Sequence, residues 1–183
     1  AQEILNEVQL KAVRRRSDFI GVCLVAHAWA VIALAAALVA VYPHPAIIVL
    51  STMAIGARQL GLVILMHDAA HGALSKSPKL NRLLGQCLCA CPMLADLPTY
   101  RRYHLLHHTR TLRDGDPDVV LTGHYPISRA SLRRKLIRDL TGQSGVSQRK
   151  YQIIAALRGQ GRTFREQLSH YWNELGPATI ANI

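Results

Sequence analysis

Two long apolar runs near the N-terminus constrain this chain more than any other feature. Residues 20–41 are 22 consecutive residues without a charged side chain, and residues 46–66 carry a single charge, at Arg58. A helix rises about 1.5 Å per residue, so either run reaches roughly across the 30 Å hydrocarbon core of a bilayer. The sequence therefore predicts two membrane-spanning helices. A secretory signal is a weaker interpretation, because the first run is long and a second follows after four residues.

The connector between the runs, "YPHP", is short and uncharged, and its prolines are expected to end one helix and begin the next. The two spans should therefore form a tight hairpin. Basic residues are concentrated at the opposite end, with four between Lys11 and Arg16 and seventeen after His71. By the positive-inside rule, the N-terminus and everything after the second span are expected to be cytoplasmic. The sequence does not distinguish a bacterial inner membrane from the endoplasmic reticulum.

These features predict an all-α integral membrane protein. We expect a transmembrane hairpin with cytoplasmic histidine-bearing helices and amphipathic interfacial helices. The expected organisation is a cytoplasmic N-terminal segment at residues 1–18, the hairpin at residues 19–66, a cytoplasmic metal-binding region at residues 67–174, and the start of a third, truncated span at residues 175–183.

Within the predicted metal-binding region, the apolar pattern is broken. Residues 80–97 are interrupted by Pro92, which favours an interfacial or re-entrant helix over a third complete span. A polar helix is expected over residues 100–110, with a turn at "DGDPD". Residues 142–150 are expected to be a loop by composition, and residues 151–173 a helix with a break near Gly159.

The formal net charge of +11 raises the question of a nucleic-acid partner. In "SLRRKLIRDL", leucines recur on one helical stripe among basic side chains, which is typical of a helix on an anionic membrane surface. The basic residues lie beside predicted spans and no aromatic stacking platform accompanies them, so we expect no nucleic-acid binding. The four cysteines, Cys23, Cys87, Cys89 and Cys91, are interpreted as small buried residues rather than disulfides or a thiolate metal site.

Five of the nine histidines form two clusters with helical spacing. His67 and His71 are four residues apart, and "HLLHH" holds His104, His107 and His108. Positions i and i+4 of a helix lie about 40° apart around its axis, so each cluster can direct imidazoles from one face. Imidazole binds iron, zinc, copper and nickel well, which makes the clusters candidate metal ligands. The isolated histidines are interpreted as ordinary polar side chains, with His170 a possible additional ligand.

"HDAAH", then "HLLHH" and "DGDPD", together resemble the first two histidine boxes of the integral-membrane fatty acid desaturase and hydroxylase superfamily. The first box there is H-x(3 or 4)-H and the second H-x(2 or 3)-H-H, and the resemblance covers residues 46–119. It implies two non-haem iron ions and O2 as co-substrate in an enzyme that removes hydrogens from a lipid chain. The implied metal ligands are His67, His71, His104, His107 and His108.

The resemblance also implies supporting residues and partners. Asp68 is a candidate to orient a ligand imidazole, and Asp116 and Asp118 either do the same or simply end a helix. The implied substrate is a lipid or acyl chain in the membrane. Without a haem or iron-sulfur motif, electrons are expected from a separate ferredoxin, cytochrome or reductase. Members of the superfamily carry a third histidine box, and nothing after His108 matches it, so we expect the remaining ligands beyond Ile183.

Several functions remain open at this point. The leading hypothesis is a fatty-acyl or lipid desaturase, and a carotenoid or lipid hydroxylase or ketolase of the same superfamily is the nearest alternative. A membrane metal-binding protein without oxidase activity, or a membrane haem protein, is a different class. Haem ligation usually places histidines at facing depths inside the spans, and only His27 lies well inside one.

Overall fold

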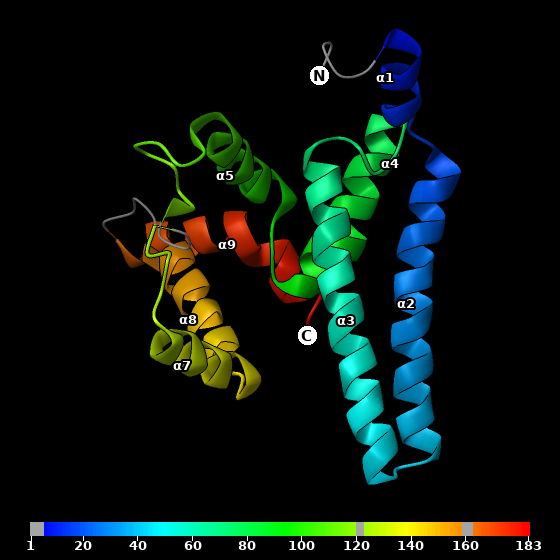
Figure 1. Cartoon of the computed structure of the whole chain (residues 1–183), viewed down its shortest axis with the longest axis vertical. Coiled ribbons are helices and arrows are strands. Elements are labelled where there is room, and N and C mark those ends of the chain that lie inside the picture. The colour runs from blue at the N-terminus through cyan, green and yellow to red at the C-terminus, as the bar shows by residue number, and fades with distance from the viewer. Residues whose placement is uncertain (1–5, 120–122, 159–162) are drawn as a thin grey trace. The chain divides into compact units, whose positions relative to one another are not determined.

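The computed structural model describes residues 6–119, 123–158 and 163–183, and every regular element in these ranges is helical. The chain forms two compact units, which are described separately (Figure 1). The first unit extends to Arg101 and includes Asn182, and the second begins at Arg102. The prediction of an all-α membrane protein is confirmed.

The first unit is built on a helical hairpin, α2 (Asp18–Val41) and α3 (Pro45–Ala70), whose helices lie side by side (Figure 1). Ser17 caps α2 by accepting from the Ile20 amide, and Pro45 occupies the first turn of α3. Both helices are long and apolar enough to cross a membrane. The predicted connector is confirmed, because only residues 42–44 separate the two helices.

The outer surface of the hairpin supports its placement in lipid. Large apolar side chains that would be buried in a soluble core are instead exposed along both helices; they include Phe19, Leu34, Leu38, Ile48, Val49, Leu50, Met53 and Leu60. So large an exposed apolar surface marks a membrane or protein contact. The short helix α1 (Glu7–Val13) and helix α4 (Pro78–Leu83) both lie at the hairpin end opposite the connector (Figure 1). The basic residues of α1 and α4 therefore flank one end of the spans, as the sequence indicates, whereas Arg58 lies within α3.

The core of the first unit lies between the hairpin and the segment that follows α4. That segment is a π-helix, η1 (Leu84–Ala90), followed by a 3-10 turn, η2 (Cys91–Met93). Cys89 and Ala90 are fully buried in the core with Leu62, and the Trp29 indole donates to the Leu88 carbonyl at 2.9 Å. The expected interruption at Pro92 is confirmed. Cys89 and Cys91 are buried, as the packing interpretation predicts, but the prediction is wrong for Cys23 and Cys87, which are exposed on their helices.

The second unit contains most of α5 (Leu97–Arg110) and the helices α7 (Arg129–Leu140), α8 (Gln143–Arg158) and α9 (Phe164–Ile180). The expected loop at residues 142–150 is wrong. Gly142 has a positive φ of 77° and ends the preceding turn, and α8 begins directly after it. In the first turn of α8, the Ser144 hydroxyl group donates to the Asp139 carboxylate of α7 at 2.5 Å, and the turn is helical despite the low helix propensity of glycine and serine. The expected break near Gly159 lies outside the described residues.

The last helix contains residues 175–180, where the sequence predicts the start of a third, truncated span, and that span stays a prediction. Residues 175–180 are the final turns of α9, which begins at Phe164 behind a Thr163 cap. Thr163 and Glu166 form a capping box, in which each side chain bonds the other's backbone amide. The amphipathic helix predicted from "SLRRKLIRDL" is α7, with Leu132, Leu136 and Ile137 exposed.

Candidate metal centre

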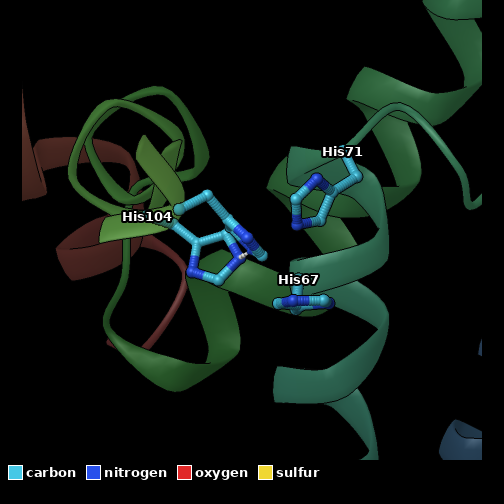
Figure 2. Close-up of side chains that lie close together, drawn as sticks. His67, His71 and His104 are labelled. Atoms are coloured by element: carbon cyan, nitrogen blue, oxygen red, sulfur yellow. Dashed lines mark hydrogen bonds between the residues drawn. The ribbon is translucent and has the colours of Figure 1, made fainter. Parts of the chain in front are cut away.

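The first histidine motif lies at the C-terminal end of α3. His67 belongs to the last turn of the helix and His71 is its C-cap, so the helix continues past the apolar run to carry both residues. Their rings are 4.7 Å apart between centroids, and both leave the same side of the helix (Figure 2). A carboxylate oxygen of Asp68 lies 3.3 Å from Nδ1 of His67. The i, i+4 prediction for this pair is confirmed.

The second motif lies on α5, in the second unit. Nε2 of His104 and Nε2 of His108 are 2.9 Å apart, with ring centroids at 4.5 Å. Two nitrogen ligands at right angles around one ion, each at about 2.1 Å from it, would be roughly 3 Å apart. The spacing of this pair therefore fits two ligands of one metal ion, which would replace the hydrogen bond between the rings. Figure 2 shows the His104 side chain.

His107 is held differently from the other two histidines of its motif. Its Nδ1 lies 2.8 Å from the carboxylate of Asp116 and 3.4 Å from that of Asp118. The hydrogen bond with Asp116 raises the pKa of His107, and the same bond lowers the pKa of the Asp116 carboxyl group. An ionised carboxylate accepts only, so Nδ1 of His107 carries the proton in this bond, and in the neutral imidazole Nε2 then presents its lone pair.

Asp116 is also part of the turn that follows α5. Its carboxylate accepts from the backbone amides of Leu112, at 2.8 Å, and Asp118, at 2.9 Å. The residue is 4% exposed, so this charge is buried and fully bonded. Asp116 thus stabilises the turn after α5 and also accepts a hydrogen bond from His107. The sequence had left these two roles as alternatives.

Two further residues complete the description. Tyr103 precedes the motif, and its hydroxyl group donates a hydrogen bond to Asp118. Tyr103 could not be found from the sequence, because a tyrosine beside a histidine motif carries no signal by itself. His170 lies on α9, and its ring donates from Nδ1 to the carbonyl of Ala156 at 2.8 Å. That bond joins α9 to α8, and a metal would have to be bound through Nε2.

Comparison with known proteins agrees with the resemblance. The family described as "Fatty acid desaturase" matches residues 43–181, which is more than half of the chain. The chain is 36% identical over 110 residues to the dihydrorhizobitoxine desaturase of Bradyrhizobium elkanii, in an alignment that covers 57% of this chain and 30% of that protein. The alignment with this chain therefore covers less than a third of the relative's length. No solved structure matches the chain.

The matched range includes both histidine motifs, the π-helix between them and the turn that holds Asp116. The residues on which the resemblance depends therefore lie inside the family match. This chain belongs to the fatty acid desaturase family.

Proposed function

We propose that this protein is a membrane non-haem di-iron oxidase that uses O2 to desaturate a fatty-acyl or lipid chain. The observation that carries the proposal is the pairing of imidazoles within each motif, His67 with His71 and His104 with His108, in a chain of the desaturase family. The i, i+4 spacing brings each pair together, so the support lies in the presence of two such pairs within the region that the family matches.

The proposed iron ligands are His67, His71, His104, His107 and His108. Imidazole suits iron, and the near-contact of the His104 and His108 nitrogens is a spacing that one ion can bridge. When bound, the iron pair would supply the activation of O2 that removal of hydrogen from an unactivated C–H bond requires, which protein side chains do not supply. The protein contributes ligand orientation, substrate binding and the exclusion of water.

The carboxylates near the motifs have a proposed role in orienting the ligands. Asp116 keeps the proton of His107 on Nδ1 and so directs Nε2 outward as the ligand atom. Asp68 is placed to do the same for His67, whose Nδ1 it approaches. Asp118 accepts a hydrogen bond from the Tyr103 hydroxyl group, and its carboxylate also lies near Nδ1 of His107.

The proposed setting is a cytoplasmic membrane surface. The hairpin anchors the protein, and the first histidine motif follows directly at the end of α3, so the acyl chain would meet the iron close to the bilayer. We propose that the N-terminus and both motifs are cytoplasmic. Electrons would come from a separate ferredoxin, cytochrome or reductase.

A second candidate is oxidation of a different substrate by the same centre. The name of the Bradyrhizobium elkanii relative assigns it dihydrorhizobitoxine, so compounds other than fatty-acyl chains belong in the assay. Hydroxylation or ketolation of a lipid or carotenoid is the other product class. Mass spectrometry separates the outcomes, because desaturation removes two hydrogens and hydroxylation adds one oxygen.

The test is expression of the complete gene in a host with simple lipids, followed by lipid mass spectrometry. We expect a lipid species lighter by two hydrogens, which His104→Ala abolishes and His124→Ala, at an exposed position between α5 and α7, leaves unchanged. An oxygen-containing product would replace the desaturase proposal by the hydroxylase. A membrane-inserted protein that holds iron, receives electrons and changes none of the candidate substrates would contradict the proposed oxidase activity.

A further inference from the structure

A basic pocket lies in the first unit, beside the C-terminal end of α3. Its cavity volume is about 550 Å³. Its lining includes four basic side chains: Arg16, Lys76, Arg82 and Arg101. No carboxylate is among the lining residues in the part of the chain that the structure describes. Sites for small molecules usually measure about 300–1,000 Å³, so the pocket is large enough for more than a simple ion.

Two of the four basic groups are held in place by the backbone. Arg16 donates from Nη1 to the Gly72 carbonyl at 2.6 Å, across 56 residues of sequence. The Arg101 guanidinium group donates to the carbonyl of Ala70. A guanidinium group has five N–H donors in a rigid plane, so one bond to a carbonyl orients the group and leaves donors for a ligand. The pocket is therefore preorganised for an acceptor-rich anion.

Capping of α3 does not account for all of this charge. A helix C-terminus has an effective charge of about half an electron, whereas four full positive charges line the pocket. The last turn of α3 also receives the Asn81 side-chain amide, which donates to the Ala69 carbonyl at 2.9 Å. The Asp18 carboxylate is bonded to the Ser75 hydroxyl group and, at 2.8 Å, to the Ser77 amide, and Asp18 is not among the lining residues. It balances at most one positive charge, so the four basic groups of the lining exceed it.

We infer that this pocket binds a phosphate ester. Phosphate oxygens are the acceptors that arginine forks match best, and lysine adds a compact charge. Apolar side chains such as Leu97 and Pro98 line the remainder of the pocket and suit the organic part of the ligand. Phospholipid headgroups and water-soluble phosphate esters share this chemistry.

The position of the pocket gives the ligand a role. Ala69 and Gly72 line it and lie on either side of His71 in the sequence, at the same end of α3 as His67. A substrate bound by its phosphate group would therefore enter beside the first histidine motif. This assignment of the ligand as substrate rests on the proposed function, whereas phosphate binding itself does not.

The test measures binding to the complete protein in a nonionic detergent at fixed ionic strength. The probes are dihexanoyl phosphatidylglycerol, glycerol 3-phosphate and, as an uncharged control, dihexanoylglycerol. We expect Arg82→Gln and Lys76→Gln each to weaken the phosphatidylglycerol probe by about tenfold, because each removes a charge-assisted contact. Lys79→Gln is the matched control, since Lys79 is exposed on the same short helix and is not among the lining residues.

Each outcome decides the inference. Binding of the phosphatidylglycerol probe alone supports a lipid headgroup, and binding of glycerol 3-phosphate as well supports a site for the phosphate ester by itself. Equal binding of the uncharged lipid, absence of phosphate binding, or equal loss in Lys79→Gln and Arg82→Gln would overturn it. Iron content is measured on the same samples. Iron retention without phosphate binding removes this inference and leaves the proposed metal centre intact, and the converse result does the reverse.

Discussion

The carboxylate of Asp116 accepts a hydrogen bond from Nδ1 of His107 across 2.8 Å, at a buried position in the turn after α5. This bond determines which nitrogen of His107 can bind a metal. With the proton held on Nδ1, Nε2 is the remaining ligand atom. The turn "DGDPD" thus contributes directly to the proposed site.

Asp116→Asn is expected to weaken iron binding while keeping one of the two turn bonds. With its oxygen in the place of Oδ2, asparagine still accepts from the Leu112 amide. Its NH2 group then takes the place of Oδ1, where it loses the bond from the Asp118 amide but can donate to Nδ1 of His107 and favour the tautomer with the proton on Nε2. Loss of a partner of this kind typically costs 10–100-fold in metal affinity, as an order of magnitude. Competition with a chelator measures the change in the purified protein.

Asp114→Asn serves as the control for this experiment, because Asp114 is exposed in the same turn. Circular dichroism of both variants checks that the helices remain. Equal iron affinity in Asp116→Asn and the unsubstituted protein would show that His107 needs no orientation by this carboxylate.

Gly21→Ala is expected to destabilise the first unit. A methyl group at position 21 would overlap the carbonyl oxygen of Leu74, so α2 and the segment after α3 would have to separate. Overpacking of this kind costs about 1–3 kcal/mol of unfolding free energy. Gly56→Ala makes the same chemical change in α3, where nothing lies within 4 Å of the added atom. Its thermal midpoint in detergent should stay within a few degrees, and a drop as large as that of Gly21→Ala would refute the described close approach.

The cysteines are expected to differ sharply in reactivity. Burial raises the pKa of the Cys89 thiol to about 12, so only about one part in ten thousand is thiolate at pH 8. Cys87 is exposed on the same π-helix. Timed alkylation with iodoacetamide in detergent, read out by peptide mass spectrometry, should modify Cys87 well before Cys89, and full unfolding should make their rates similar. Equal rates in the folded protein would contradict the buried position of Cys89.

The hairpin and the histidine pairing were predictable for clear physical reasons. Two uncharged runs of bilayer length allow little except membrane-spanning helices, and α2 and α3 follow them within a few residues. The i, i+4 spacing likewise determines that His67 approaches His71 and that His104 approaches His108.

Features that depend on tertiary packing were harder to predict. The π-helix of residues 84–90 has no distinct sequence pattern, and it forms where Gly85 packs closely against Ala69. Glycine and serine have low helix propensity and predict a loop at the first turn of α8, whereas that turn is helical and is bonded to α7 through Ser144 and Asp139. The bond between His107 and Asp116 depends on the path of a turn, which residue spacing does not determine.

The most direct test of the account is the iron content of the complete protein after anaerobic reconstitution with Fe(II) and removal of loose metal. The proposal predicts about two iron ions per chain, with loss of iron in His67→Ala and also in His104→Ala, and full retention in His124→Ala. That result would show that the iron centre needs ligands from both histidine motifs. Iron retained at full stoichiometry in either motif variant, with the protein folded, would contradict the claim that the two motifs share in binding it.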